Sequence, residues 1–271
     1  LLRAAAADAA AEAPPGAIPL PPPERARGMR PVLVPHLLGA EEIALVKQVS
    51  QDAAARDHHK HAAGSQWRTR YLQAGGAFRH LAAALLEKLR GAALEAALGP
   101  GGWGLLRGMD AARLRPRVLE HHLVSAGGAL SDPTHFDGGS LLTLDVMLSE
   151  PGRDFGGGEF CTTEADGTHA HHSFGQGDAL VFVSHKPHHV RPVTWGLRQV
   201  LILELWDGEE RRCDHRCPLH RGRCPDEDAP LASEGPAADG AAPDAADALA
   251  VDAERAFAAT SWYGLAFFPK L

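Results

Sequence analysis

Two histidines and one aspartate stand in this chain at spacings that suit a metal site. His135 and Asp137 are separated by one residue, so on an extended strand their side chains project from the same face and can chelate one ion. His188 follows a later apolar segment. Two imidazoles and one carboxylate leave three positions open, which suits a non-haem Fe(II) that also takes a bidentate co-substrate and O2. Zinc hydrolases more often keep a single open position.

The segment around His188 strengthens this interpretation, because a lone His-x-Asp pair arises easily among 16 histidines and 34 acidic residues. Residues 179–183 and 198–206 are apolar runs typical of buried strands, and residues 192–196 are expected to form a loop and turn between them. Arg198 then begins a buried strand and needs a partner. Its planar guanidinium matches the carboxylate of a dicarboxylic 2-oxo acid, while pairing with one of the chain's own carboxylates is the alternative.

Three motifs in order carry a resemblance to a known family. They are His135-Phe136-Asp137, the Gly-rich segment 154–160 that ends in Phe, and residues 188–198, which follow the pattern H-x-V-x-P-V-T-x-G-x-R. With them the chain resembles the 2-oxoglutarate and Fe(II)-dependent dioxygenases, in the prolyl 4-hydroxylase and lysyl hydroxylase-like branch. The resemblance covers residues 117–206, with weaker similarity back to Pro31.

Only one of the two adjacent histidines can join His135 and Asp137, because adjacent side chains on a strand face opposite ways. Aligning the family pattern on Pro192, Gly196 and Arg198 selects His188 and leaves His189 as the fallback.

The resemblance implies an activity and its cofactors. Fe(II) would be held by His135, Asp137 and His188, and Arg198 would anchor the distal carboxylate of 2-oxoglutarate. O2 is the second co-substrate, ascorbate is a further expected requirement, and succinate and CO2 are the co-products. The implied substrate is a prolyl or lysyl side chain of a peptide or protein. An oxygenase acting on a small molecule or nucleobase is one alternative, and a catalytically silent jelly-roll binding module is another.

Two further residues are candidates for contact with the co-substrate. Thr143 is a polar residue in the apolar run 141–148, where it could bond either 2-oxoglutarate or the backbone. Many relatives carry a Tyr on the strand before the His-x-Asp pair, whereas this chain has none there. His122, with Glu120 and Val124 on the same face by alternation, is the candidate replacement, and loss of the contact is the other outcome.

The same segments predict the fold class, which is mostly β with flanking helices around a double-stranded β-helix (jelly-roll or cupin-like) core. Short strands separated by Gly-rich turns, among them 126–128, 138–139 and 156–158, recur from residue 117 to 206. A first strand is expected at 31–34, and helices at 41–55 and 77–97 are expected to pack on the outer face of one sheet.

Length and composition bound the organisation. With 271 residues, 45% of them apolar, the chain can bury a sizeable core, and its net charge of −7 argues against a nucleic-acid partner. No apolar run approaches the ~20 residues of a membrane span, so we expect a soluble protein of undetermined oligomeric state. We divide it into a flexible Ala/Pro-rich segment 1–28, a dioxygenase domain 29–208 with its catalytic core at 117–206, a Cys/His-rich segment 209–224, a flexible acidic linker 225–248 and a C-terminal helix and docking tail 249–271.

The chain has four cysteines. Cys161 follows the Gly-rich segment, while Cys213, Cys217 and Cys224 cluster after the last core strand with His215 and His220 between them. A structural zinc site is conceivable, but the spacing matches no common finger. A disulfide is preferred, with free thiols as the alternative, and a disulfide favours the secretory pathway over the cytoplasm. The remaining histidine groups, at 58–61 and 169–172, are interpreted as solvated loops.

Overall fold

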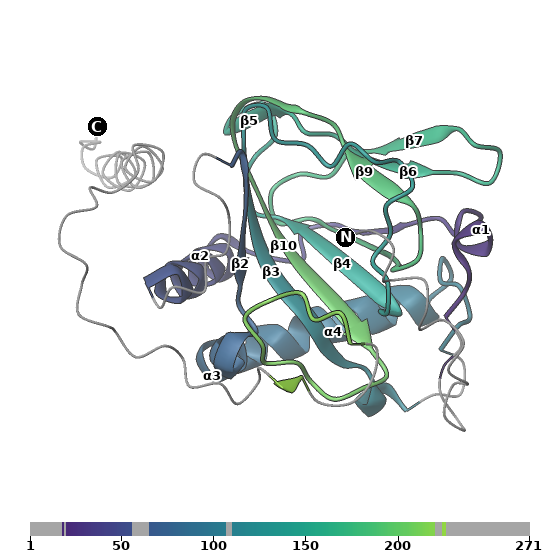
Figure 1. The fold of residues 1–271 in the computed structure, drawn as a ribbon, viewed down its shortest axis with the longest axis horizontal. Coiled ribbons are helices and arrows are strands. Elements are labelled where there is room, and N and C mark those ends of the chain that lie inside the picture. Colours follow the sequence, from purple (N-terminus) through teal and green to yellow (C-terminus); the bar gives the residue numbers. More distant parts are fainter. Residues whose placement is uncertain (1–17, 19, 56–64, 107–109, 220–223, 226–271) are drawn as a thin grey trace, which may run out of the picture. The chain divides into compact units, whose positions relative to one another are not determined.

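The larger of two β-sheets is organised around β10 (Val193–Trp206), in a computed structural model that describes residues 18, 20–55, 65–106, 110–219 and 224–225. β10 pairs antiparallel with β3 (Arg115–Ser125) on one side and β4 (Leu142–Met147) on the other. The sheet order is β1-β8-β4-β10-β3-β2, and Figure 1 shows β4, β10, β3 and β2 side by side. The remaining strands are β1 (Val32–Val34), β2 (Trp67–Tyr71), β8 (Ala179–Val183) and β5 (Phe155–Gly157), which also pairs with β10.

The smaller sheet has three antiparallel strands in the order β7-β6-β9, namely β7 (His169–His172), β6 (Phe160–Thr163) and β9 (His188–Val190). One hydrophobic cluster joins side chains of the two sheets, among them Phe160 and Val190 from the smaller sheet and Phe182, Val200 and Ile202 from the larger one. Two antiparallel sheets that enclose such a core form the jelly roll that the sequence predicts, so the expected fold class is confirmed.

Two long helices cover the other face of the larger sheet. α2 (Ala40–Ala55) and α4 (Ala83–Leu98) contribute Val46 and Leu89 to a second core, which they share with Leu144 of β4 and Leu203 of β10 (Figure 1). Shorter elements are α1 (Pro23–Ala26), α3 (Ala77–Leu81) and the 3-10 turns η2 (Ala74–Gly76) and η3 (Ala111–Arg113). The expectation that helices pack on one outer face is confirmed.

The expected single helix over 77–97 is wrong. The chain leaves helical geometry at Ala82, with φ −140° and ψ 41°, so α3 and α4 are separate helices. The break lets Phe78 of α3 and Leu86 of α4 enter the same core. Neither glycine nor proline marks the position, so the Ala- and Leu-rich sequence reads as one continuous helix and tertiary packing overrides its propensity.

Alternation along the strands sends polar side chains to the space between the sheets. Leu144 on β4 and Leu203 on β10 belong to the core under the helices, while Met147 and Ile202 belong to the core between the sheets. Because successive side chains point to opposite faces, the residues that share the inner face include Thr143 and Asp145 on β4 and Arg198 and Glu204 on β10. All four are buried.

Three local predictions need correction. β10 begins at Val193, where a loop is expected, and absorbs Gly196 at φ +76°. Gly156 and Gly157 form part of β5 instead of a turn, and a Cβ at Gly156 would lie 2.2 Å from Trp195 Nε1, so the close strand pairing needs glycine there. Residues 169–172 form β7 instead of a loop, because backbone pairing with β6 tolerates polar side chains on an exposed strand.

Some predictions fall outside the described residues, namely the histidines at 58–61, the linker residues 226–248 and the C-terminal segment 249–271. Among the described helices, none combines the length and apolar character that crossing a membrane requires.

Candidate metal and co-substrate site

The structure brings His135, Asp137 and His188 together. One ligand atom from each lies within 4.8 Å of the other two. His135 Nε2 is 3.5 Å from Asp137 Oδ1, and His188 Nε2 is 3.9 Å from Asp137 Oδ2. The side chain of His135 is 34% exposed, whereas those of Asp137 and His188 are 5% and 7% exposed. The cluster is therefore closed on the Asp137 and His188 side and opens to solvent beside His135.

Backbone hydrogen bonds fix the segments that carry these three side chains. The His188 N–H donates to His135 O at 2.8 Å, and the Asp137 N–H donates to Ser184 O at 2.8 Å. The loop bearing the His-x-Asp pair is thereby attached to the segment that leads from β8 into β9. The pair itself is not on a strand of the described structure, so these bonds, and not strand alternation, place both side chains on the same cluster.

Neighbouring groups orient each metal-ligand candidate. His188 Nδ1 lies 2.9 Å from Lys186 O and donates to it, so the lone pair of the neutral ring stands on Nε2, the atom that faces Asp137. Phe160 stacks on the His188 ring at 5.3 Å and Phe182 meets its edge at 5.1 Å. These contacts leave the ring one orientation, and they keep water from its apolar faces.

The charges of the cluster suit a cation. Burial lowers the pKa of His188, so its imidazole is neutral at neutral pH. Burial alone would favour the neutral form of Asp137, but His188, His135 and Arg216 outweigh it and hold the pKa of Asp137 well below its usual range. A neutral imidazole beside an ionised carboxylate is the protonation state in which both groups can coordinate a metal.

Arg198 occupies the inner face of β10 and is 1% exposed. Its Nε and Nη2 atoms have no hydrogen-bond partner within the part of the chain that the structure describes, and the carboxylate oxygen Asp145 Oδ2 is 3.9 Å from Nη2. Asp145 Oδ1 also lacks a hydrogen bond, and burial raises the pKa of Asp145 to about 6 despite the neighbouring Arg198. A buried guanidinium with unused donors is costly unless an anion completes its hydrogen bonds, so this arrangement fits a bound carboxylate.

A glycine of the Gly-rich segment makes room for Arg198. Gly158 has φ +67°, and a Cβ there would lie 2.9 Å from Arg198 Cδ and 3.0 Å from Val193 Cγ2. Any larger residue would combine an unfavourable backbone conformation with a clash against the Arg198 side chain. Gly158 therefore lets Arg198 lie flat across the inner face.

The other sequence candidates take different places. Thr143 Oγ1 donates to Asp137 Oδ2 at 2.8 Å and lies 2.9 Å from Ser184 Oγ, so Thr143 contacts a metal-ligand candidate in this structure. His122 Nε2 lies 2.9 Å from Glu120 Oε2. His189 is outside the metal-ligand cluster, and its ring stands 5.0 Å from that of His169, on the face of β9 opposite to His188.

Sequence reasoning missed Arg216, which reaches the site from the segment after β10. Its Nη1 and Nη2 atoms are each 3.4 Å from Asp137 Oδ1. Nη2 also donates to Glu204 Oε1, and Nε lies 3.6 Å from Glu120 Oε1. One cation thus bridges three buried carboxylates. These carboxylates raise the pKa of Arg216, so it stays charged. No sequence signal points to this role, because Arg216 lies among cysteines beyond the last strand.

Glu204 is the most deeply buried of these acids, at 0% exposure. Burial raises its pKa to about 7, while Arg216 opposes that change. Ser140 Oγ donates to Glu204 Oε2 at 2.6 Å, and Arg117 Nη1 lies 3.6 Å from the same oxygen. Glu204 therefore joins β10 to the loop before β4 and to Arg216.

All four cysteines are free in the structure. The disulfide preferred from the sequence is therefore not formed, and the alternative of free thiols holds in this structure. Cys161 lies apart on β6, and the other three cysteines form a small buried cluster of their own.

No protein-family model and no curated protein matches this chain. Solved structures do resemble it. A 2OG-Fe(II) oxygenase family oxidoreductase from Burkholderia pseudomallei has 15% identity and a TM-score of 0.48, over 67% of this chain and 87% of the other. The viral collagen prolyl hydroxylase of Paramecium Bursaria Chlorella virus-1 has 14% identity and a TM-score of 0.48, over 68% and 99%. The carbocyclase SnoK from nogalamycin biosynthesis has 14% identity and a TM-score of 0.49, over 70% and 85%.

Proposed function

We propose that this protein is an Fe(II)- and 2-oxoglutarate-dependent dioxygenase that hydroxylates a C–H bond. The observation that carries the proposal is the occurrence of two features along β4, where Thr143 bonds Asp137 and Asp145, two residues further on, lies beside Arg198. His135, Asp137 and His188 offer two imidazoles and a carboxylate, and Arg198 offers hydrogen-bond donors that no group among the described residues satisfies. A metal site with open positions beside a buried carboxylate receptor is the arrangement that a chelating dicarboxylic 2-oxo acid requires.

The donor set fits ferrous iron. Two imidazoles and one carboxylate, with no thiolate, match the ligands of non-haem Fe(II) oxygenases, which keep open positions for a co-substrate and O2. His188 has its Nδ1 bonded to a backbone carbonyl, and Asp137 accepts a hydrogen bond from Thr143. Such outer hydrogen bonds orient metal ligands and raise their basicity.

When bound, the iron and 2-oxoglutarate would supply the oxidising chemistry, with O2 consumed and succinate and CO2 released. The chain's own residues would bind, orient and exclude water. Arg198 would bind the distal carboxylate of 2-oxoglutarate, and Asp145 would stay protonated beside it up to a pH of about 6. Phe160 and Phe182 would keep water away from His188.

The proposed substrate is a prolyl or lysyl side chain of a peptide or protein. The order of the three motifs supports it, since the branch that the sequence resembles acts on such side chains. The exposure of the site supports it as well. His135 is the exposed member of the cluster, and Phe136 beside it is 37% exposed with its ring 5.1 Å from that of His185. An exposed aromatic ring next to the opening offers a surface on which a peptide can pack.

The first experiment is an anaerobic titration of metal-free protein with Fe(II) and 2-oxoglutarate, followed by the visible charge-transfer band of the chelated pair. His188→Ala and His189→Ala form a matched pair, because the two residues are adjacent but face opposite ways. We expect the band in wild type and in His189→Ala, and its loss in His188→Ala. Wild-type protein that binds metal but gives no band would refute the dioxygenase proposal.

The second experiment addresses the substrate. Peptides that contain Pro or Lys, matched to peptides in which that residue is Ala, are incubated with Fe(II), 2-oxoglutarate, O2 and ascorbate. We expect one oxygen atom to be added to the peptide and succinate to be formed in equal amount. Turnover with a small molecule or nucleobase alone would replace the peptide proposal. Co-substrate binding without any turnover would favour a silent binding module.

A further inference from the structure

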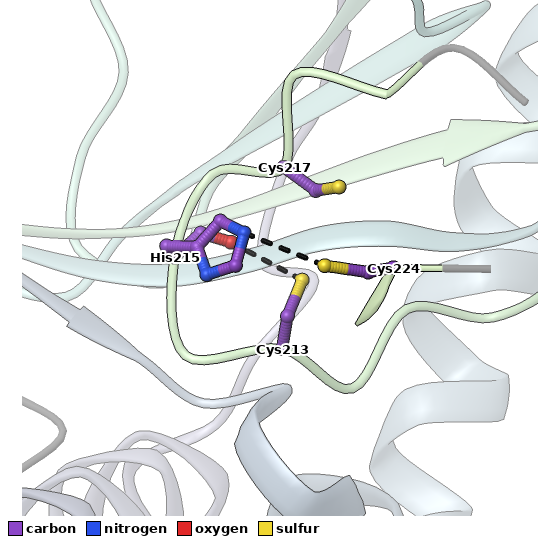
Figure 2. Close-up of side chains that lie close together, drawn as sticks. All are labelled: Cys213, His215, Cys217 and Cys224. Carbon is purple, nitrogen blue, oxygen red and sulfur yellow. Dashed lines mark hydrogen bonds between the residues drawn. The ribbon is translucent and has the colours of Figure 1, made fainter. Parts of the chain in front are cut away.

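Three cysteines and one histidine converge after the last strand. Cys213, His215, Cys217 and Cys224 each offer one ligand atom, and these four atoms all lie within 4.8 Å of one another. The cysteines are buried at 1%, 2% and 3% exposure and form a cluster separate from both main cores. Figure 2 shows the sulfur atom of Cys224 directed toward the His215 ring and that of Cys213 directed toward the His215 carbonyl oxygen. The dioxygenase proposal uses none of these four residues.

We propose that Cys213, His215, Cys217 and Cys224 bind one zinc ion, which fastens the segment that delivers Arg216 to the metal-ligand cluster. Three thiolates and one imidazole form a common ligand set of structural zinc sites, and four protein ligands leave no open position for catalysis. Zn–S bonds of about 2.3 Å in a tetrahedron place sulfur atoms about 3.8 Å apart. Cys224 Sγ already lies 3.6 Å from His215 Nε2, so little movement is needed.

The surroundings of His215 support a metal on its Nε2 atom. Nδ1, the other ring nitrogen, lies 3.3 Å from Asp214 Oδ1. A carboxylate on the far nitrogen of a metal-bound histidine fixes the tautomer and aims the other nitrogen at the ion. The same ring thus has a carboxylate on one nitrogen and a cysteine sulfur on the other.

A disulfide accounts for the cluster less well. One bond joins two sulfur atoms and would leave the third thiol of this buried group beside a histidine. All three thiols are free, and each has its sulfur within reach of the same centre. The sequence spacing Cys-x-His-x-Cys-x6-Cys fits no common finger, but the fold brings the four ligands together without needing one.

The proposed zinc segment is attached to the barrel through the backbone of its own ligands. Arg117 Nη2 on β3 donates to Cys217 O at 2.9 Å, and Gln73 Nε2 donates to His215 O at 3.4 Å. Arg216 stands between these two ligands in the sequence. Its main chain is therefore held on both sides, while its guanidinium reaches Asp137 and Glu204.

The test uses the full-length protein with Co(II) as the metal probe. Thiolate ligands give cobalt an intense near-ultraviolet charge-transfer band, which a His, His, Asp site lacks. We expect this band in wild type and in His135→Ala, and its loss in Cys224→Ser. Cys161→Ser is the matched control, because Cys161 is also buried but lies on β6 away from the cluster. A failure of the dioxygenase proposal would leave these results unchanged.

Asp214→Asn tests the site without removing a ligand. Loss of an outer carboxylate typically costs 10- to 100-fold in metal affinity, so we expect zinc to bind about tenfold more weakly while the fold persists. Hydrogen exchange tests whether zinc holds this segment in place. The backbone amides of residues 211–219 should be less protected in Cys224→Ser than in zinc-loaded wild type, and protection of β4 should be unchanged. The proposal is overturned by absence of the thiolate band in wild type, by a disulfide among these cysteines in the freshly purified protein, or by equal exchange in the two proteins.

Discussion

The backbone N–H of His188 donates to the carbonyl oxygen of His135 at 2.8 Å, so two metal-ligand candidates that are far apart in the sequence share a direct main-chain hydrogen bond. Their rings stand 5.0 Å apart and nearly perpendicular, at 85°. The spacing of the two imidazoles is thus set by the backbone and not by the side chains alone. A site built in this way is arranged before any metal binds, which lowers the ordering cost of binding.

Arg198→Gln should weaken 2-oxoglutarate binding at least tenfold and leave Fe(II) binding nearly unchanged. Hydrogen bonds to charged groups contribute about 1.5–3 kcal/mol each, which corresponds to roughly ten- to hundredfold in affinity. Calorimetry in the presence of Fe(II) would measure the affinity for 2-oxoglutarate. Arg153→Gln is the control, because Arg153 is an exposed Arg that pairs with Asp154. Equal affinities of the two variants for 2-oxoglutarate would show that Arg198 does not bind the co-substrate.

Gly158→Ala should lower both stability and 2-oxoglutarate affinity. A residue with a Cβ pays about 1–2 kcal/mol in left-handed backbone geometry, and here the Cβ would also press on Arg198. Gly167→Ala separates the two effects, because Gly167 has φ +82° but nothing within 4 Å of the added Cβ. Urea denaturation should show similar backbone costs in both variants, and only Gly158→Ala should lose co-substrate affinity. Loss in both would point to a general effect of strain.

Asp145 should make the protein less stable as the pH rises. Its pKa of about 6 in the folded chain exceeds the ordinary value of 3.8, so the folded state binds the proton more tightly and its stabilising effect is present below pH 3.8 and lost as the pH rises through 6. The difference between the two pKa values corresponds to about 3 kcal/mol of unfolding free energy. As the pH rises from 4 to 7, the unfolding free energy of Asp145→Asn should therefore increase relative to that of wild type. Denaturation curves at several pH values would measure this difference. A constant offset between the two curves would contradict the assignment.

Thr143→Val should weaken Fe(II) binding about 10- to 100-fold, because it removes the hydroxyl that bonds Asp137. If Thr143 instead contacts the co-substrate directly, 2-oxoglutarate affinity would fall while the affinity for Fe(II) alone would hold. Binding measured with and without 2-oxoglutarate distinguishes the two roles. Thr168→Val is the control, since Thr168 also donates to a carboxylate, that of Asp166, but in an exposed turn.

Arg216→Gln should destabilise the fold by about 2 kcal/mol, because it leaves Glu120, Asp137 and Glu204 without their shared cation. The cost lies below the 3–5 kcal/mol of a fully buried pair because a third of the Arg216 side chain is exposed. The matched control is Arg212→Gln, an exposed Arg of the same segment. Zinc content should not change in either variant. An unchanged unfolding free energy would show that the carboxylates find another partner.

The sequence predicts the fold class, and it predicts that His135, Asp137 and His188 come together, because both depend on local signals. Apolar runs predict the strands β4, β8 and β10. Alternation along each strand then predicts which polar side chains lie on the inner face. The helix α2 follows from its amphipathic pattern, and the helical character of residues 77–97 follows from their Ala- and Leu-rich composition. The break at Ala82 does not, since no glycine or proline marks it, and on its two sides Phe78 and Leu86 pack in the same core.

Arg216 and Asp145 show what sequence reasoning cannot reach here. Asp145 stands in an apolar strand, and only the register of β4 against β10 places it beside Arg198. Arg216 meets Asp137 through a segment without helix or strand, whose path is set by backbone contacts to the barrel and by the clustered cysteines. Residues 169–172 are a milder case, because pairing with β6 makes a strand of a polar, His-rich run.

The position of Arg216 also determines the order in which this protein can finish folding. The cation follows Asp137 by 79 positions, after every strand of the barrel. A nascent chain that has emerged only as far as β10 already contains Glu120, Asp137 and Glu204, and their mutual repulsion opposes burial. We therefore expect the barrel to stay hydrated at this end until the cysteine-rich segment docks. Closure of the site would then come after the described strands have formed, once the chain has been made past residue 216.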